Sequence, residues 1–264
     1  LVITRDNTGE FPGFNLIGNP YPCEVYTSKP FYTVQYDAVE DKTYFDVGNN
    51  PIPPCSAILV QAQTAEESVS FSKTPIANQA SITMKLSKSN IRSAHHIDQA
   101  RISFEADYKL SKYTWDDASS TIYIPQNGQN FAVAYADGAN EMPINIHVVQ
   151  NGTYTISFEE INLNLNYLHL IDNLTGNEVD LLATPNYTFE AKTTEYASRF
   201  KLVFSICEDG DNGNDSFVFA SNGQLHLLNK GEAQLQIVDI MGRILSTETI
   251  HGSCSKALNL SDGI

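Results

Sequence analysis

The sequence predicts an all-β fold of the sandwich type, and three observations support that prediction. Apolar and polar residues alternate with period two in many short segments, as they do in strands that bury one face. Asn-Gly, Asp-Gly and proline positions separate these segments, which recur roughly every 8–15 residues. Helical periodicity is nearly absent. Short strands with regular turn signals favour packed sheets over a helical or mixed fold.

Length, composition and charge are compatible with this fold and exclude several partners. The chain has 264 residues, enough for about two domains, and 42% of them are hydrophobic. The net charge of −15 argues against nucleic acid, whose phosphates require clustered Lys and Arg, and against anionic membrane surfaces. No run of 18 apolar residues occurs, so we expect no membrane insertion. The chain begins at Leu1 without a signal-peptide pattern, and we expect it to be part of a larger protein.

The first segment, residues 1–78, is rich in proline and tyrosine and contains two of the four cysteines. Cys23 and Cys55 each follow a proline, and we predict a disulfide between them, with two buried free thiols as the alternative. A bond between Cys207 and Cys254 is a weaker prediction. No Cys-x-x-Cys pair is present, so zinc and thioredoxin-like sites are not expected.

Residues 79–206 hold the longest uninterrupted alternation and predict a jelly-roll-like β-sandwich. In residues 100–107 one face carries Ile102, Phe104 and Ala106, and the charged residues occupy the other face. The same pattern recurs in three later segments, which contain Ile144, Ile146 and Val148; Tyr154, Ile156 and Phe158; and Phe200, Leu202 and Phe204. Whether this segment shares a core with residues 1–78 is left open.

Residues 207–215 predict an acidic linker, because the segment contains no apolar side chain beyond Cys207. Its carboxylates form a weak calcium candidate, which consists of Asp209, Asp211 and Asp215. The segment does not fit an EF-hand loop, because the glycine required at position 6 is Asn214. A solvated hinge is the favoured interpretation. Residues 216–264 then predict a small, incomplete β-sandwich.

The end of the chain has a strand–turn–strand pattern over residues 235–245, with the turn at Met241-Gly242-Arg243. This pattern resembles the C-terminal sorting domain of proteins exported by the type IX secretion system of Gram-negative bacteria. The resemblance implies an Ig-like sandwich, truncated at Gly263-Ile264, and a secreted or cell-surface location at the outer membrane. It implies the secretion machinery as a partner, which would contact a sorting surface formed by Ile237, Asp239, Gly242 and Arg243.

A second resemblance covers the first two segments. Residues 14–22, Phe-Asn-Leu-Ile-Gly-Asn-Pro-Tyr-Pro, are similar to a motif of large surface proteins that carry this sorting signal. Further matching elements follow in the family's order, at residues 54–62, 69–71, 151–155, 168–182, 187–191 and 199–204. The resemblance indicates a family more than a function, since domains of this kind end proteins of many different activities.

No catalytic signature is found, and we expect no catalytic residues. His95 and His96 are adjacent, so in a strand they point to opposite faces and cannot easily share a metal. The carboxylate pairs Asp116-Asp117 and Glu159-Glu160 are also adjacent and cannot flank one glycosidic bond. No Gly-x-Ser-x-Gly nucleophile motif or phosphate-binding loop occurs. A hydrolase is therefore the least favoured interpretation.

One cluster suggests carbohydrate binding. Tyr113 and Trp115 are two residues apart, so in a strand they share a face that could stack on a sugar ring. Asp116 and Asp117 follow and could accept hydrogen bonds from sugar hydroxyls. The alternative is that Trp115 packs in the core.

The sequence as a whole predicts a non-enzymatic structural and secretion-sorting module, without a cofactor other than a weakly indicated calcium ion. The alternative is an adhesin or carbohydrate-binding module, whose partner would be a glycan or a host surface protein.

Overall fold

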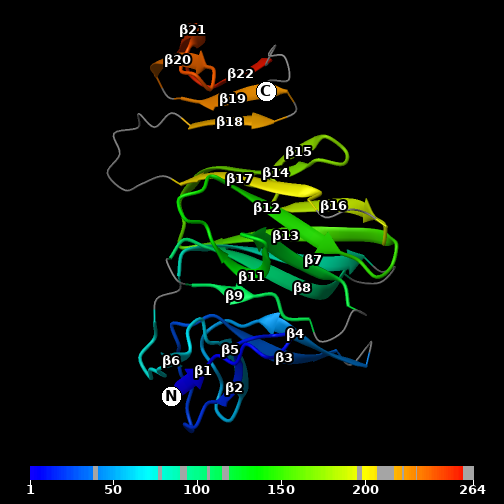
Figure 1. Cartoon of the computed structure of the whole chain (residues 1–264). Helices are drawn as coiled ribbons and strands as arrows, with labels where there is room; N and C mark the ends of the chain where they lie inside the picture. The colour runs from blue at the N-terminus through cyan, green and yellow to red at the C-terminus, as the bar shows by residue number, and fades with distance from the viewer. Residues whose placement is uncertain are drawn as a thin grey trace. The chain divides into compact units, whose positions relative to one another are not determined.

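The computed structural model describes residues 1–37, 41–76, 79–89, 94–105, 108–114, 119–194, 198–206, 217–221, 223–229 and 231–257. Every helix or strand in these ranges is a β-strand, which confirms the all-β prediction (Figure 1). None of the described residues forms a helix long and apolar enough to cross a membrane. The chain divides into two compact units. Unit 1 contains Leu1–Leu163 and Tyr167–Phe204, and unit 2 contains Asn164–Asn166 and Ser205–Ile264.

Unit 1 begins with a small antiparallel sheet in the strand order β2-β5-β3-β4. These strands are β2 (Phe14–Gly18), β3 (Phe31–Asp37), β4 (Lys42–Val47) and β5 (Ala57–Gln61). A separate pair is formed by β1 (Val2–Thr4) and β6 (Glu66–Ser68). Residues of both sheets, including Ile3, Phe31 and Val60, pack with Val25 and its bridge partner Ile52 in one fully buried cluster.

The remainder of unit 1 is an eleven-stranded sheet system in the order β15-β14-β17-β12-β10-β11-β8-β7-β13-β16, with β9 beside β11 (Figure 1). Its strands are β7 (Ser81–Ser89), β8 (Ala94–Ser103), β9 (Leu110–Ser111), β10 (Thr121–Gln126), β11 (Gln129–Tyr135), β12 (Glu141–His147), β13 (Gly152–Ile161), β14 (Leu165–Asp172), β15 (Asn177–Asp180), β16 (Asn186–Ala191) and β17 (Phe200–Ile206).

Strand β10 joins the two halves of this system. Its first residues, Thr121–Tyr123, pair with β12, and its last residues, Ile124–Gln126, pair with β11. One strand therefore changes partner along its length, as strands do at the corners of sandwiches. The Asn127-Gly128 turn that connects β10 to β11 has φ values of 52° and 76°, so both residues are left-handed, as this dipeptide predicts.

The predicted alternation is confirmed in several strands. Tyr154, Ile156 and Phe158 of β13 are buried, and so are Phe200, Leu202 and Phe204 of β17. Strand β8 differs from the expectation of one polar face, because Arg101 and Ser103 are buried as well as Ile102. Both faces of β8 are covered, since other parts of unit 1 pack on each of them.

A second buried cluster joins the small sheet to the larger system. Tyr32 and Val47 from the small sheet pack with Leu110, Ala132 and Val133. The Tyr32 hydroxyl donates a hydrogen bond of 2.8 Å to the Ser111 carbonyl. Residues on either side of position 78 therefore contribute to a common core.

Unit 2 is built from a three-stranded sheet and a hairpin. The sheet has the order β18-β19-β22, formed by β18 (Phe217–Ser221), β19 (Gln224–Leu228) and β22 (Cys254–Ala257). The hairpin pairs β20 (Glu232–Val238) with β21 (Ile244–His251). Its turn lies at Met241-Gly242-Arg243, where the sequence predicts it.

Candidate functional site

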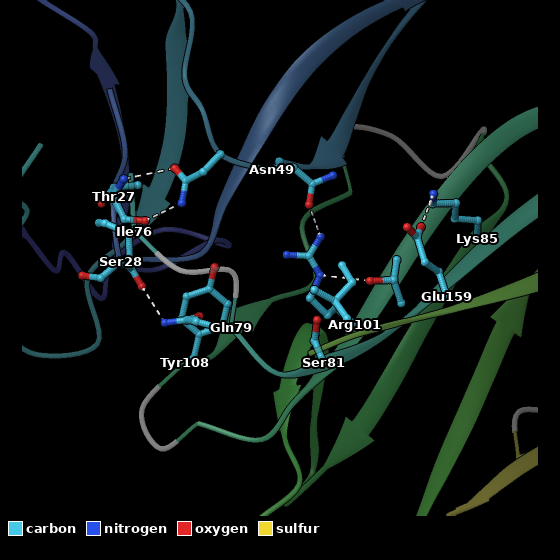
Figure 2. Close-up of a pocket in the computed structure, with 14 residues that line it drawn as sticks. Thr27, Ser28, Asn49, Ile76, Gln79, Ser81, Lys85, Arg101, Tyr108 and Glu159 are labelled. Carbon is cyan, nitrogen blue, oxygen red and sulfur yellow. Dashed lines mark hydrogen bonds and ion pairs between the residues drawn. The ribbon is translucent and has the colours of Figure 1, made fainter. Parts of the chain in front are cut away.

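A polar cavity of about 260 Å³ lies within unit 1 (Figure 2). One wall comes from the loops of the small sheet, at residues 27–28 and 48–50. The other wall comes from β7, β8 and β13, through side chains such as Thr83, Arg101 and Glu159. Residues far apart in the sequence therefore meet around one space.

Arg101 places a buried positive charge in the wall of this cavity. It lies on β8 between Ala100 and Ile102, and only 7% of its surface is exposed. Its Nε donates to Thr83 Oγ1 at 3.2 Å, and its Nη2 donates to Asn49 Oδ1. The Tyr108 hydroxyl interacts with the same guanidinium. Figure 2 shows the guanidinium in the centre of the cavity wall.

The charge of Arg101 is not matched by a direct counterion. Among the described residues, no carboxylate forms an ion pair with its guanidinium; Asp46 and Glu159 act on it only at longer range. Burial therefore lowers the pKa of Arg101, because desolvation disfavours the charged form. The group still remains charged at neutral pH, as arginine does in proteins. At the rim, Lys85 Nζ pairs with Glu159 Oε2 at 2.8 Å.

Gln79 lines this cavity and carries an unsatisfied acceptor. Its Oε1 is buried and has no hydrogen-bond partner, and its Nε2 reaches the Ser28 carbonyl only at 3.5 Å. Buried amide oxygens are normally hydrogen-bonded. On the small-sheet side of the cavity, hydrogen bonds hold the two loops together. Asn50 Nδ2 donates to Thr27 O, and Asn50 Oδ1 accepts from Thr27 N.

A neighbouring, larger cavity of about 710 Å³ shares Gly48, Asn49 and Lys85 with the first. It contains a histidine–carboxylate pair in which His96 Nε2 lies 3.0 Å from Asp46 Oδ2. Asp46 Oδ1 is buried without a partner. No hydroxyl or thiol among the described residues hydrogen-bonds His96, so the pair does not have the geometry of an activated nucleophile.

The residues predicted to bind a glycan are only partly described. Tyr113 is half-buried, and its ring lies 4.5 Å from Phe11, 4.9 Å from Phe45 and 5.1 Å from Phe14 between centroids. It therefore packs against the small sheet. Trp115, Asp116 and Asp117 lie outside the described residues, and their role in binding remains a prediction.

The predicted sorting surface lies at the end of the β20–β21 hairpin. Asp239 Oδ1 accepts hydrogen bonds from the backbone N–H groups of Met241 and Arg243, and Asp239 Oδ2 accepts from Arg243 Nε at 3.0 Å. Gly242 has a φ of 79°, which favours glycine. Ile237 is half-buried, whereas Ile240 and Met241 are 87% and 85% exposed. A fixed turn therefore displays two apolar side chains.

The predicted disulfide is not formed in the structure, where Cys23, Cys55 and Cys254 are free thiols. Cys55 lies in a turn with a φ of 59° and is exposed, while Cys23 is half-buried. The calcium candidates Asp209, Asp211 and Asp215 lie outside the described residues. The residues that are described contain no group of three or more His, Cys, Asp or Glu side chains that could hold a metal.

Sequence reasoning did not identify the Arg101 cavity. The only available signal was a basic residue within an apolar strand, and alternation assigned that residue to the polar face. The carboxylate Glu159, considered only as part of a pair with Glu160, proves to lie at the rim of this cavity. Comparison of the chain with protein-family models, with curated proteins and with solved structures gave no match.

Proposed function

We propose that this chain is a non-enzymatic structural and secretion-sorting module of a secreted or cell-surface protein. The observation that supports it is the display of Ile240 and Met241 at the end of the unit 2 hairpin. Exposed apolar side chains on a fixed turn are a feature of recognition surfaces, because a preorganised element loses little entropy on binding. The partner would be the secretion machinery.

The structural role is assigned to unit 1. One of its buried clusters contains residues from both the small sheet and the larger system, which favours a single rigid body. A jelly-roll arrangement of residues 79–206 and an Ig-like arrangement of unit 2 are part of the proposal. The change of partner along β10 supports the first of these, since it connects two sheets.

Substitution at the hairpin end tests the sorting role. The double variant Ile240→Ser, Met241→Ser is expected to fold, because both side chains are exposed. In the native host, the full-length protein with this change should accumulate in the periplasm instead of on the surface or in the medium. Fractionation and immunoblotting would measure the distribution.

A matched control removes exposed apolar side chains elsewhere. Leu174 and Leu182 in unit 1 are 61% and 43% exposed, so Leu174→Ser, Leu182→Ser makes a comparable change outside the hairpin. Its export should equal that of the wild type. Equal export of the hairpin variant would contradict the proposed role of this surface.

A further inference from the structure

We infer that the Arg101 cavity binds a small hydroxylated carboxylate of the size of one sugar acid, with the carboxylate on Arg101 and a hydroxyl on Gln79. This inference is independent of the proposed sorting function, since it concerns unit 1 alone. Either proposal can fail without the other.

The first argument is the state of the Arg101 guanidinium. A guanidinium carries five N–H donors, and the described neighbours Thr83, Asn49 and Tyr108 occupy only part of them. All three neighbours are uncharged. An arginine that is buried beside neutral groups retains a net positive charge, and a carboxylate is the group that its planar fork matches best.

The second argument is the orphaned Gln79 Oε1. It needs a donor, and a carboxylate cannot provide one. A ligand hydroxyl can, once the Gln79 amide, which is held only by a bond of 3.5 Å to Ser28 O, turns its Oε1 towards the ligand. The cavity therefore contains a site for an anion and a site for a donor, and a hydroxy acid satisfies both, whereas a simple anion satisfies only the first.

The volume of the cavity and the net charge of the chain restrict the ligand further. The volume of about 260 Å³ is below the range of pockets for drug-sized ligands and leaves room for a single small ring or chain. The chain as a whole carries a net charge of −15, which repels anions in general. Binding of a carboxylate would thus depend on the local charge of Arg101, because the other cation of the lining, Lys85, is paired with Glu159.

Calorimetric titration of the full chain with sodium glucuronate, at low ionic strength, tests the inference. We expect saturable binding with a dissociation constant on the order of 1 mM. Glucose, which lacks the carboxylate, and acetate, which lacks the hydroxyls, should each bind at least about tenfold more weakly. Absence of glucuronate binding, or equal binding of acetate, would overturn the inference.

Substitutions in the cavity wall test whether glucuronate binds there. Gln79→Glu removes no strong hydrogen bond and puts a negative charge on the cavity wall, so it should weaken glucuronate binding about tenfold or more. Arg101→Lys keeps the positive charge but loses the planar guanidinium that matches a carboxylate, so it should weaken glucuronate binding by a similar factor. Gln129→Glu makes the same charge change at an exposed position of the β10–β11 hairpin and should leave binding unchanged. Unaltered affinity in folded Gln79→Glu protein, with the melting temperature as the check, would contradict the assignment.

The source of the carboxylate can be distinguished in the same titration. A methyl glycoside of glucuronic acid imitates the end of an acidic glycan, whereas the free acid imitates a metabolite. Binding of both compounds supports a site that accepts a glycan end, and binding of the free acid alone supports a site for a free hydroxy acid.

Discussion

Arg199 and Asp172 form a two-pronged ion pair inside unit 1, with Nε–Oδ1 at 3.0 Å and Nη2–Oδ2 at 2.8 Å. Both side chains are almost fully buried, and the Tyr187 hydroxyl donates a further bond to Asp172 Oδ2. The remaining Arg199 nitrogen donates to the Glu190 carbonyl. The pair therefore ties β14 and the start of β17 to β16, and removing one partner leaves a buried charge unpaired.

Replacement of Asp172 by Asn should destabilise the protein by about 3–5 kcal/mol, because the Arg199 charge loses its counterion. Chemical denaturation followed by circular dichroism would measure the loss. The control Glu141→Gln breaks the exposed pair between Lys201 and Glu141 and should cost less than about 1 kcal/mol. A similar cost for both variants would contradict the role of the buried pair.

The same pair predicts a dependence on acid pH. Burial alone would raise the pKa of Asp172, but hydrogen bonds and the charge of Arg199 outweigh burial, so the pKa lies below its ordinary value of 3.8. The unfolded chain therefore takes up the proton first. This stabilisation is present above about pH 4 and lost as the pH falls through the folded pKa. The unfolding free energy of Asp172→Asn should depend less on pH in this range than that of the wild type.

Tyr32 predicts a dependence on alkaline pH. Burial raises its pKa well above 10.0, and the hydroxyl both donates to Ser111 O and accepts from Tyr113 N at 3.0 Å. A folded pKa above the unfolded one gives stability that is present below about pH 10 and lost as the pH rises further. The protein should unfold more readily at pH 11 than at pH 8. In Tyr32→Phe this difference should shrink, whereas exposed Tyr21→Phe should retain it.

Gly48 is predicted to be required by packing. A Cβ at this position would overlap the ring of Phe31, which is itself fully buried. Gly48→Ala should therefore destabilise by about 1–3 kcal/mol or more, since a close-packed core cannot absorb the added methyl group. Gly18→Ala is the control, because its Cβ would meet only the Ser56 carbonyl at 3.9 Å. Equal melting temperatures of the two variants would contradict this account.

In the Gly-Asn-Pro-Tyr-Pro motif, the Asn19 side chain hydrogen-bonds to the backbone of the surrounding loops. Its Nδ2 donates to the carbonyls of Cys23, Ile52 and Pro53, and its Oδ1 accepts from Tyr21 N. Asn19→Ala should leave several backbone groups unsatisfied and destabilise by about 2–3 kcal/mol. Asn173→Ala, at an exposed position with one long bond to Ser198 O, should cost much less in the same denaturation experiment.

Strands and tight turns could be predicted from the sequence, because each depends on a few neighbouring residues. The alternation of Tyr154, Ile156 and Phe158 identified a strand and its buried face, because side-chain direction in a strand has period two. The turn at Asn127-Gly128 followed from the tolerance of both residues for positive φ. The turn at Gly242 followed from the same chemistry. These features depend on a few neighbouring residues, which a sequence shows directly.

The cavity could not be predicted in this way. Alternation places Arg101 on the charged face of its strand, because the pattern describes one sheet and contains no information on what packs over that face. The cover comes from Asn49 and its neighbours, 52 positions earlier in the chain. The pairing of His96 with Asp46 likewise spans 50 positions. Contacts of this kind depend on the packing of whole sheets, and the cavity exists only because two of them meet.

The two pairings of β10 have a mechanical consequence when unit 1 is placed under tension. Three of its residues pair with β12 and the next three pair with β11, so separating the two halves at this strand breaks one ladder and leaves the other intact. Each ladder holds only three residue pairs, and a tethered molecule would open at one of them while β10 stays attached to the other half.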